Sequence, residues 1–301
     1  MFDWNDLRYF LAVARSGSTL AAARLLDVSQ PTVQRRLAVL ERQTGRSLVE
    51  RHPTGYRLTD VGKDLLPYAE RIEQHVHAFE RQLAASDDEL TGTIRITCPE
   101  ADIDHLLASV LSRFQAENPG LRLEFLVTDR ALDLAKGEAD VALRGGPQPD
   151  SALIGRKIAD CPWLVYASRS YVERYGKPRE ASEINQHAVI AYTGRITELR
   201  PVRWLRSISP HASIAAYSNT VLGALSAAKS GLGLVMLPAH VGDREDDLIC
   251  VVEPQPELIE PFTLLVHPDL RDTPRVRALL DFLASQAGTL RSLFRGKACE
   301  S

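Results

Sequence analysis

The chain of 301 residues has few cysteines and no long uninterrupted hydrophobic run. Its four cysteines are Cys98, Cys161, Cys250 and Cys299. They lie far apart and form no C-x-x-C pair, which argues against a disulfide scaffold or a zinc site and is typical of a reducing cytoplasm. The most apolar stretch, residues 221–241, is interrupted by a lysine, three glycines and a proline, so it does not predict a transmembrane helix. Acidic residues among the first ten argue against a secretory signal.

The sequence also lacks the motifs that mark common enzymes. It contains no G-x-S-x-G, H-E-x-x-H, P-loop or G-x-G-x-x-G pattern, so we predict no catalytic residue, no cofactor and no enzyme. A metal site is suggested by His75 with His77, but residues two apart point to different faces of a helix. Asp102 with Asp104-His105 suggests a second metal site, but a helix-capping role for Asp102 explains this pattern better. A small-molecule transferase or lyase is the alternative, and a turnover assay would separate it from a binding protein.

Positive charge is concentrated at the start of the chain. The total formal charge is −3, which by itself does not point to nucleic acid. Residues 1–60, however, hold nine arginines and no lysine against six acids, a formal charge of +3. The next segment, 61–91, has a charge of −4, and the remainder has −2. A basic piece on an acidic body favours a local contact with a polyanion, and scattered surface charge is the alternative.

The first sixty residues predict a helix-turn-helix. Apolar residues at helical spacing predict an amphipathic helix over 4–15, and an Ala-rich stretch predicts a second helix over 20–26. Asp27-Val28-Ser29 predicts a tight turn whose serine caps a third helix, which ends at Gly45. Two helices joined by so short a turn are suited to reading a major groove.

The third helix and the hairpin after it carry the residues that we expect to bind DNA. Residues 48–51 and 56–58 predict two short strands, which form a wing. Arginine binds guanine through two hydrogen bonds, glutamine binds adenine in the same way, and a helix N-terminus favours a phosphate. A generic three-helix bundle with solvated arginines is the alternative. The expected contacts are Thr32, Gln34, Arg35 and Arg36 in the third helix, and Arg51, His52 and Arg57 in the wing.

Several runs of this region resemble the LysR-type transcriptional regulators. They are LRYFLAVARSGS from Leu7, AAARLLDVSQPTV from Ala21, Leu40-Glu41, and RLTDVG from Arg57. The chain departs from the family with Gln34-Arg35 in place of Ser-Arg, and with Leu48-Val49-Glu50-Arg51 in place of Leu-Phe-Glu-Arg. The resemblance implies that Gln30, Thr32 and Arg35 face DNA and that Arg51 and Arg57 contact phosphates. Ser29 and Pro31, at the start of the third helix, complete the expected set.

A long helix is expected to connect this region to the rest of the chain. Thr59 is a candidate cap for a helix that reaches about Ala85, with apolar residues repeating at steps of three and four as in a coiled coil. Such a stripe needs a partner, either the body of the same chain or a second copy. The resemblance favours a second copy, and so implies a homodimer through this helix and a homotetramer built from dimers. Ser86-Asp87-Asp88-Glu89 and Thr91-Gly92 then predict a hinge.

The C-terminal body alternates strand and helix patterns. We expect strands over 93–97, 121–127 and 139–143, with helices over 103–114 and 131–136 between them, which predicts a parallel sheet. A second set of strands is expected over 164–167, 188–192, 214–217 and 233–237, with a helix over 219–228. A strand over 262–266 and a closing helix over 276–283 follow.

This body resembles the effector domain of the same family, a pair of lobes like those of periplasmic binding proteins. The matching runs are GTIRI from Gly92, NPG from Asn118, GEADVALR from Gly137 and GLGLVMLP from Gly231. The resemblance implies an α/β fold with a winged helix-turn-helix domain over 1–58, a linker helix and hinge over 59–91, and an effector domain over 92–301. Lobe one would comprise 92–163 and 266–301, and lobe two 164–265.

We expect the effector beyond the carboxyl ends of the strands, where helix N-termini point amide donors at a ligand. A cap or turn role is the alternative for each residue taken singly. The family often has Ser or Thr where Ala101 stands, so that hydroxyl is missing here. The candidate effector residues are Cys98, Pro99, Glu100, Ala101, Thr128, Asp129, Arg144, Thr193, Ser218 and Asn219.

Taken together, the sequence predicts a cytoplasmic, sequence-specific transcription regulator. Its partners would be double-stranded DNA, read as a half-palindromic site, and a small-molecule effector whose binding moves the lobes; no membrane is involved. An architectural DNA-binding protein that ignores small molecules is the second alternative. It predicts no ligand-dependent change in footprint or melting temperature.

Overall fold

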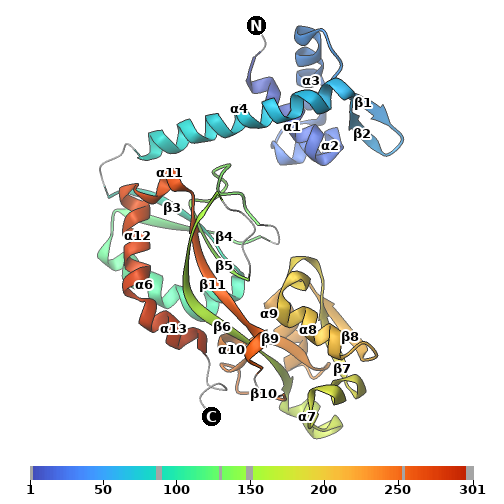
Figure 1. Cartoon of the computed structure of the whole chain (residues 1–301), viewed down its shortest axis with the longest axis vertical. Coiled ribbons are helices and arrows are strands. Elements are labelled where there is room, and N and C mark those ends of the chain that lie inside the picture. Colours follow the sequence, from blue (N-terminus) through green and yellow to red (C-terminus); the bar gives the residue numbers. More distant parts are fainter. Residues whose placement is uncertain (1–2, 86–89, 129–130, 147–151, 253–254, 296–301) are drawn as a thin grey trace. The chain divides into compact units, whose positions relative to one another are not determined.

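The computed structural model describes residues 3–85, 90–128, 131–146, 152–252 and 255–295. The chain divides into two compact units, Met1–Glu80 and Arg81–Ser301, which are described separately (Figure 1). Among the helices of the described residues, none combines the length and the apolar character that crossing a bilayer requires.

The first unit begins with the three predicted helices, α1 (Asn5–Ser16), α2 (Thr19–Leu25) and α3 (Gln30–Thr44). Gly17 and Gly45 end α1 and α3 in the left-handed conformation, with φ of 63° and 67°, which glycine adopts without steric cost. Strands β1 (Val49–His52) and β2 (Gly55–Leu58) then form an antiparallel hairpin. This is a winged helix-turn-helix.

Apolar side chains from all three helices and the hairpin form the core of the first unit. Phe10, Ala22, Val33 and Leu40 are almost completely buried in it. The linker helix α4 (Asp60–Ala85) adds Ala69 to this core. The Thr59 hydroxyl accepts a hydrogen bond from the Gly62 N–H at 3.0 Å, so Thr59 caps α4.

The second unit is built on a seven-stranded sheet of mixed direction. The path of neighbouring strands is β10-β6-β11-β5-β3-β4, and β9 pairs with β6. The strands are β3 (Gly92–Thr97), β4 (Leu121–Leu126), β5 (Val141–Gly145), β6 (Ile154–Ser168), β9 (Val235–Pro238), β10 (Leu248–Cys250) and β11 (Ile259–Val266). Strand β3 runs parallel to β4 and β5, whereas β6 and β11 run antiparallel to their neighbours.

Two long strands connect the two parts of this unit. Figure 1 shows β6 and β11 running from the part that holds α6 (Ala108–Glu117) and α12 (Pro274–Ser285) toward the part that holds α8 (Arg200–Ile208) and α9 (Val221–Lys229). The remaining elements of the first part are α5 (Glu100–Asp102), η1 (Ile103–Leu107), α11 (Pro268–Arg271) and α13 (Ala287–Arg295).

The second part has its own small parallel sheet, β7 (Ala188–Tyr192) with β8 (Ser213–Ser218). The short helices of this stretch of the chain are α7 (Arg169–Tyr175), η2 (Ala181–Gln186), η3 (Gly194–Glu198), α10 (Ala239–Gly242) and η4 (Pro256–Leu258). One core of buried apolar residues runs through both parts, from Ile94 on β3 to Leu234 beside β9.

The structure corrects four local expectations. Residues 131–136 form no helix, because Asp133 instead accepts backbone hydrogen bonds within a turn that closes at Gly137. The large sheet is not purely parallel, because β6 and β11 return through it. The strand expected over 164–167 extends back to Ile154, because β11 pairs with it along its length. The helix expected over 103–114 begins with a π-helical turn, η1.

Candidate nucleic-acid interface and effector site

The N-terminus of α3 is built as a capped helix start. The Ser29 hydroxyl accepts a hydrogen bond from the Thr32 N–H at 3.4 Å and lies 2.9 Å from the Thr32 hydroxyl. Pro31 occupies the first turn, where its missing N–H leaves no bond unmade. Gln30 donates from Nε2 to the Thr19 hydroxyl of α2 at 2.9 Å. These contacts fix the angle between the two helices of the motif.

Gln34 and Arg35 form the open part of this helix start. Both side chains are exposed, and within the described part of the chain neither makes a hydrogen bond or an ion pair. Val33 and Leu37, on the opposite face, are buried. The buried face therefore holds α3 in place, and the exposed face presents an amide and a guanidinium to solvent. Both groups have the geometry for two-point contacts with base edges.

Arg36 lies differently from its neighbour Arg35. Its Nη1 atom donates to Asp6 Oδ1 on α1 at 3.2 Å and lies 3.8 Å from Asp3 Oδ2. Asp6 is completely buried, so this ion pair joins α3 to α1 inside the unit. In this structure Arg36 serves the packing of the motif.

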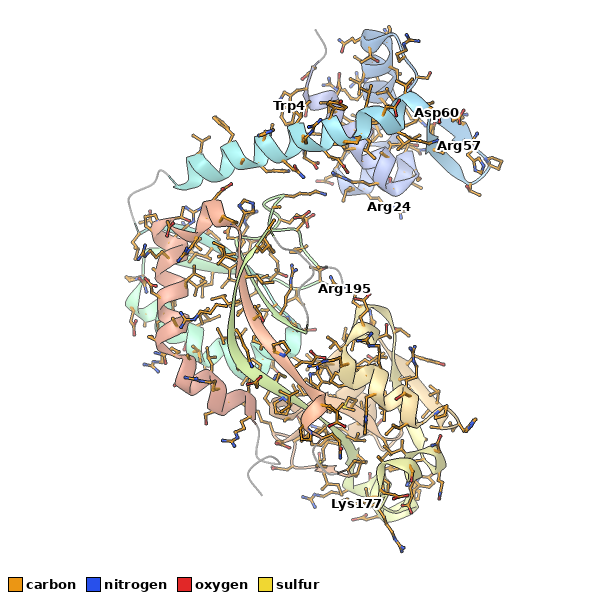
Figure 2. The ribbon with its side chains drawn as sticks, viewed as in Figure 1. Trp4, Arg24, Arg57, Asp60, Lys177 and Arg195 are labelled. Atoms are coloured by element: carbon orange, nitrogen blue, oxygen red, sulfur yellow. The ribbon has the colours of Figure 1, made fainter. Side chains whose placement is uncertain are left out.

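The wing carries its three predicted side chains on exposed positions. Arg57 pairs with Glu50 across the hairpin, with Nε 2.7 Å from Oε1, and His52 Nδ1 lies 2.9 Å from the Thr54 hydroxyl. Arg51 is exposed without a partner among the described residues. Figure 2 shows Arg57 on the hairpin and Arg24, a further exposed arginine, on α2.

One residue that positions the wing escaped the sequence analysis. The Glu41 carboxylate Oε1 on α3 accepts the backbone N–H groups of Leu48 at 2.7 Å and Val49 at 3.1 Å. It thus ties the first strand of the wing to the helix. The only signal in the sequence is the Leu40-Glu41 pair, which we noted as part of the family resemblance and not for this contact.

The candidate effector residues fall into two groups. In the first, α5 lies against α9, so the segment after β3 and the segment after β8 meet. The Thr193 N–H donates to the Ser218 carbonyl at 2.9 Å, which brings Thr193 to the same place. Pro99, Glu100, Thr193 and Asn219 are exposed there, whereas Cys98 and Ala101 are buried in the core. The expected residues of lobes one and two therefore converge.

The second group follows the two strands that flank β3, where Thr97 lies beside Leu126 of β4 and Ala142 of β5. Arg144 donates from Nη2 to the Leu132 carbonyl at 2.5 Å, and Thr128 is exposed beyond β4. Asp129 lies outside the described residues. A surface hollow of about 200 Å³ is bounded by β6, β11, α11 and α12 and contains none of the candidate residues. The hollow lies at the start of β6 and the end of β11, whereas the convergence at α5 and α9 follows the ends of β3 and β8.

Two capping roles differ from those expected. Asp102 makes no cap, and its carboxylate instead contacts the His240 ring, with Oδ1 2.8 Å from Nε2. Thr220, rather than Ser218, caps α9 by accepting the Gly223 N–H at 3.0 Å. Ser218 lies just before this cap, and its hydroxyl donates to the Thr220 carbonyl at 2.8 Å. Among the described residues, no group of three or more His, Cys, Asp or Glu side chains is arranged to hold a metal ion.

These features define the class of the protein: a winged helix-turn-helix unit with a linker helix, followed by a two-part α/β binding domain. Comparisons with known families give the same division. The bacterial regulatory helix-turn-helix protein, lysR family, matches residues 4–63, and the LysR substrate binding domain matches residues 87–288. The chain belongs to the LysR family of bacterial transcriptional regulators. It is a DNA-binding regulator with an effector-binding domain, which confirms the prediction of a regulator and not an enzyme.

Individual relatives support this assignment. A HTH-type transcriptional regulator of Xanthomonas campestris pv. campestris (strain 8004) is 34% identical over 189 residues, which are 63% of this chain and 55% of that protein. The regulator CrgA of Neisseria meningitidis serogroup C (strain 8013) is 29% identical over 297 residues, 94% of this chain and 97% of CrgA.

Solved structures show the same architecture. The structure of CrgA from Neisseria meningitidis matches with a TM-score of 0.59 and 26% identity, over 96% of this chain and 100% of that one. Full-length CbnR in complex with its target DNA matches with a TM-score of 0.56 and 22% identity, over 94% of this chain and 99% of that one. The second likeness supports the fold alone.

Proposed function

We propose that this regulator reads a half-palindromic DNA site with the N-terminal half of α3, as a homodimer in the bacterial cytoplasm. The observation that carries the proposal is the capped start of α3, where Gln34 and Arg35 are exposed on a helix whose other face is buried. Arg35 would bind a guanine and Gln34 an adenine. Ser29, Gln30, Pro31 and Thr32 would lie at the phosphate backbone beside the helix N-terminus.

The wing supplies the second contact. Arg51, His52 and Arg57 stand on exposed positions of a hairpin that Glu41 fixes to α3. Arg57 would leave its partner Glu50 and bind a phosphate oxygen. The loss costs little free energy, because an exposed ion pair contributes little to stability. The wing contributes affinity in this arrangement, and α3 contributes the choice of sequence.

The linker helix supports dimerisation. Leu65, Tyr68, Ile72, Phe79 and Leu83 on α4 are all exposed, at steps of three, four and seven along most of the helix. An adjacent face contacts the winged unit through Ala69 and through Arg15, which donates to both carboxylate oxygens of Glu73. The exposed apolar stripe of α4 is long enough to pack against the same stripe of a second copy of the chain, while the adjacent face of the helix stays bound to the winged unit. Two such dimers would form the homotetramer.

Lobes one and two would enclose the effector at the place where the segments after β3 and β8 meet. Pro99, Glu100, Thr193 and Asn219 would contact it directly, and Cys98, Ala101 and Ser218 would shape the backbone behind them. Thr128, Asp129 and Arg144 would close the site from the ends of β4 and β5. An effector that binds one arrangement of the lobes more tightly would change the spacing of the DNA-binding units. It can shift the equilibrium between the two arrangements only by the ratio of its affinities for them.

The DNA-binding proposal is tested by genomic footprinting, followed by titration of the recovered site. Arg35→Ala should weaken binding by ~1–3 kcal/mol and relax the preference at one position of each half-site. Arg206→Ala, which removes an exposed arginine of α8 in lobe two, is the control and should bind normally. Unchanged affinity in Arg35→Ala would remove this residue from the interface.

The effector proposal is tested by a thermal-shift screen of small acids and aromatic compounds on the full chain. A compound that raises the melting temperature is then titrated against Thr128→Trp and against Asn219→Trp. Loss of the shift with intact DNA binding supports the site. A shift that survives in both variants places the effector elsewhere, and a complete absence of ligand-dependent change favours the architectural alternative.

A further inference from the structure

Three buried polar side chains form a chain of contacts through the second unit. Asp102 ends α5 in lobe one, Cys161 lies on β6, and His240 lies on α10 in lobe two. His240 Nε2 is 2.8 Å from Asp102 Oδ1, and His240 Nδ1 is 3.8 Å from Cys161 Sγ. The side chains of both His240 and Asp102 are less than a tenth exposed. None of these contacts was expected from the sequence.

The direction of the hydrogen bonds follows from the donors available. A carboxylate oxygen accepts, so we assign the ring proton of His240 to Nε2, which donates it to Asp102. In this tautomer Nδ1 is an acceptor, and the Cys161 thiol donates to it. Burial, with the nearby carboxylates of Asp102, Glu260 and Asp160, raises the pKa of the Cys161 thiol well above its ordinary value, which keeps the thiol proton in place.

The surroundings hold this chain of contacts rigidly. The ring of Phe294 on α13 packs edge-on against the His240 ring, with the centroids 4.9 Å apart. The other end of α10 is fixed by the Tyr166 hydroxyl of β6, which donates to Asp243 at 2.6 Å. Inside a region with so little water, a hydrogen bond to a charged group is stronger than at the surface, and an unpaired carboxylate is costly. Asp102 and His240 therefore depend on each other.

Asp102 lies where its contact with His240 can affect the proposed effector site. It directly follows residues 98–101, which we assign to the effector site, and it directly precedes the π-helical turn η1. A π-turn is rare and is often found at functional sites. We propose that Asp102 and His240 are positioning residues that couple the segment after β3 to lobe two, so that movement of residues 98–101 is transmitted to α10 and the reverse.

Hydrogen exchange of the full chain, without DNA or ligand, tests this coupling. Two substitutions of one residue form a matched pair. The side-chain amide of His240→Gln can reach the place of Nε2 and keep the donor to Asp102. The shorter His240→Asn places its amide near Nδ1 and loses that donor. The two variants have similar polarity and differ in whether the link survives.

In His240→Asn we expect amide exchange to increase at least about tenfold in residues 237–243 and also in residues 97–107 of lobe one, the factor that follows from losing a hydrogen bond to a charged group. His240→Gln should exchange like the wild type in both segments. Faster exchange in 237–243 with no change in 97–107 would show that His240 matters only to its own helix and would overturn the proposal. No change in either segment would also overturn it.

The converse substitutions keep the test valid if His240→Asn fails to fold. Asp102→Asn retains an oxygen that accepts from Nε2, whereas Asp102→Ala does not. If the two segments are coupled, amide exchange in residues 237–243 should become faster in Asp102→Ala and stay as in the wild type in Asp102→Asn. Equal exchange in the two Asp102 variants would contradict the coupling.

Nitrogen-15 spectra of labelled histidine in the wild-type chain give an independent measurement, with His240→Gln identifying the signal. A proton on Nε2 and a bare Nδ1 are expected, and the opposite tautomer would overturn the link. The proposal concerns contacts within the second unit alone. A chain that shows the coupling and binds no DNA would disprove the proposed function without disproving this inference.

Discussion

Arg36 on the third helix donates a hydrogen bond to Asp6 on the first helix at 3.2 Å, across 30 positions of the sequence. The carboxylate of Asp6 is fully buried, and its second oxygen has no partner among the described residues. Arg35, the next residue back along the helix, is exposed without such a partner. Two adjacent arginines of the recognition helix therefore serve different purposes, one for packing and one for the surface that we assign to DNA.

Substitution separates these two purposes. Arg36→Ala leaves a buried carboxylate without its charged donor, so we expect the first unit to lose roughly 1–3 kcal/mol of unfolding free energy, measured by native-state hydrogen exchange in α1 and α3. Arg35→Ala should change that value by less than about 0.5 kcal/mol, because its side chain is exposed, and should weaken binding to the footprinted site. A destabilised Arg35→Ala, or an undisturbed Arg36→Ala, would reverse the assignment.

Glu41 should matter to the wing more than to the rest of the helix. Its carboxylate accepts two backbone N–H groups, so Glu41→Ala should destabilise the hairpin by about 1.5–3 kcal/mol, seen as faster hydrogen exchange at Leu48 and Val49. Glu41→Gln retains an acceptor oxygen and should lose less. Equal exchange in the two variants would show that the hydrogen bonds do not hold the wing.

The affinity for DNA should fall steeply with salt. Each phosphate-bound cation releases a counterion, which contributes a slope of about −0.9 to the logarithm of the affinity against the logarithm of the salt concentration. Arg51→Gln removes one such contact from each protomer, so the slope of a dimer should become shallower by about 2, with little change in which sequence is preferred. A flat salt series for the wild type would contradict the proposed DNA contacts.

The exposed stripe of α4 should control the oligomeric state. Phe79→Glu places a charge in the apolar stripe through which two copies of this helix would pair, and because Phe79 is 64% exposed the single chain should still fold. We expect sedimentation to show monomers. Gln74→Glu adds the same charge on the opposite side of the helix and should leave the dimer intact. Dimers of Phe79→Glu as stable as those of the wild type would place the interface elsewhere.

Cys98 and Cys161 should resist alkylation in the native chain. Burial raises the pKa of both thiols above the ordinary value, and Asp102 adds to the effect in each case, so at pH 8 the reactive thiolate is scarcer than in a free cysteine. Mass spectrometry after iodoacetamide treatment should find both unlabelled, and labelled once urea unfolds the chain. Rapid native labelling of Cys161 would contradict the burial on which the contact with His240 depends.

Local signals in the sequence determined the elements of the first unit and the character of its exposed face. Ser29, Gly17, Gly45 and Thr59 act at helix ends through neighbours within a few residues, so spacing alone predicts them. The apolar stripe of α4 is a repeat that is read in the same way. The resemblance to the LysR family, carried in the C-terminal body by other runs such as GTIRI from Gly92 and GLGLVMLP from Gly231, also identified the effector domain.

Only the tertiary structure decided which polar groups meet. Asp6 with Arg36, Glu41 with the Leu48 N–H, and Asp102 with His240, 138 positions away, are joined by the packing of separate elements. The aspartate at 102 follows a strand and looks like a helix cap, and nothing near it in the sequence reveals the histidine that it binds. Strand β6 likewise extends to Ile154 because β11 supplies its hydrogen bonds. Caps and periodic faces depend on short-range geometry, whereas buried polar pairs depend on how elements distant in the sequence pack together.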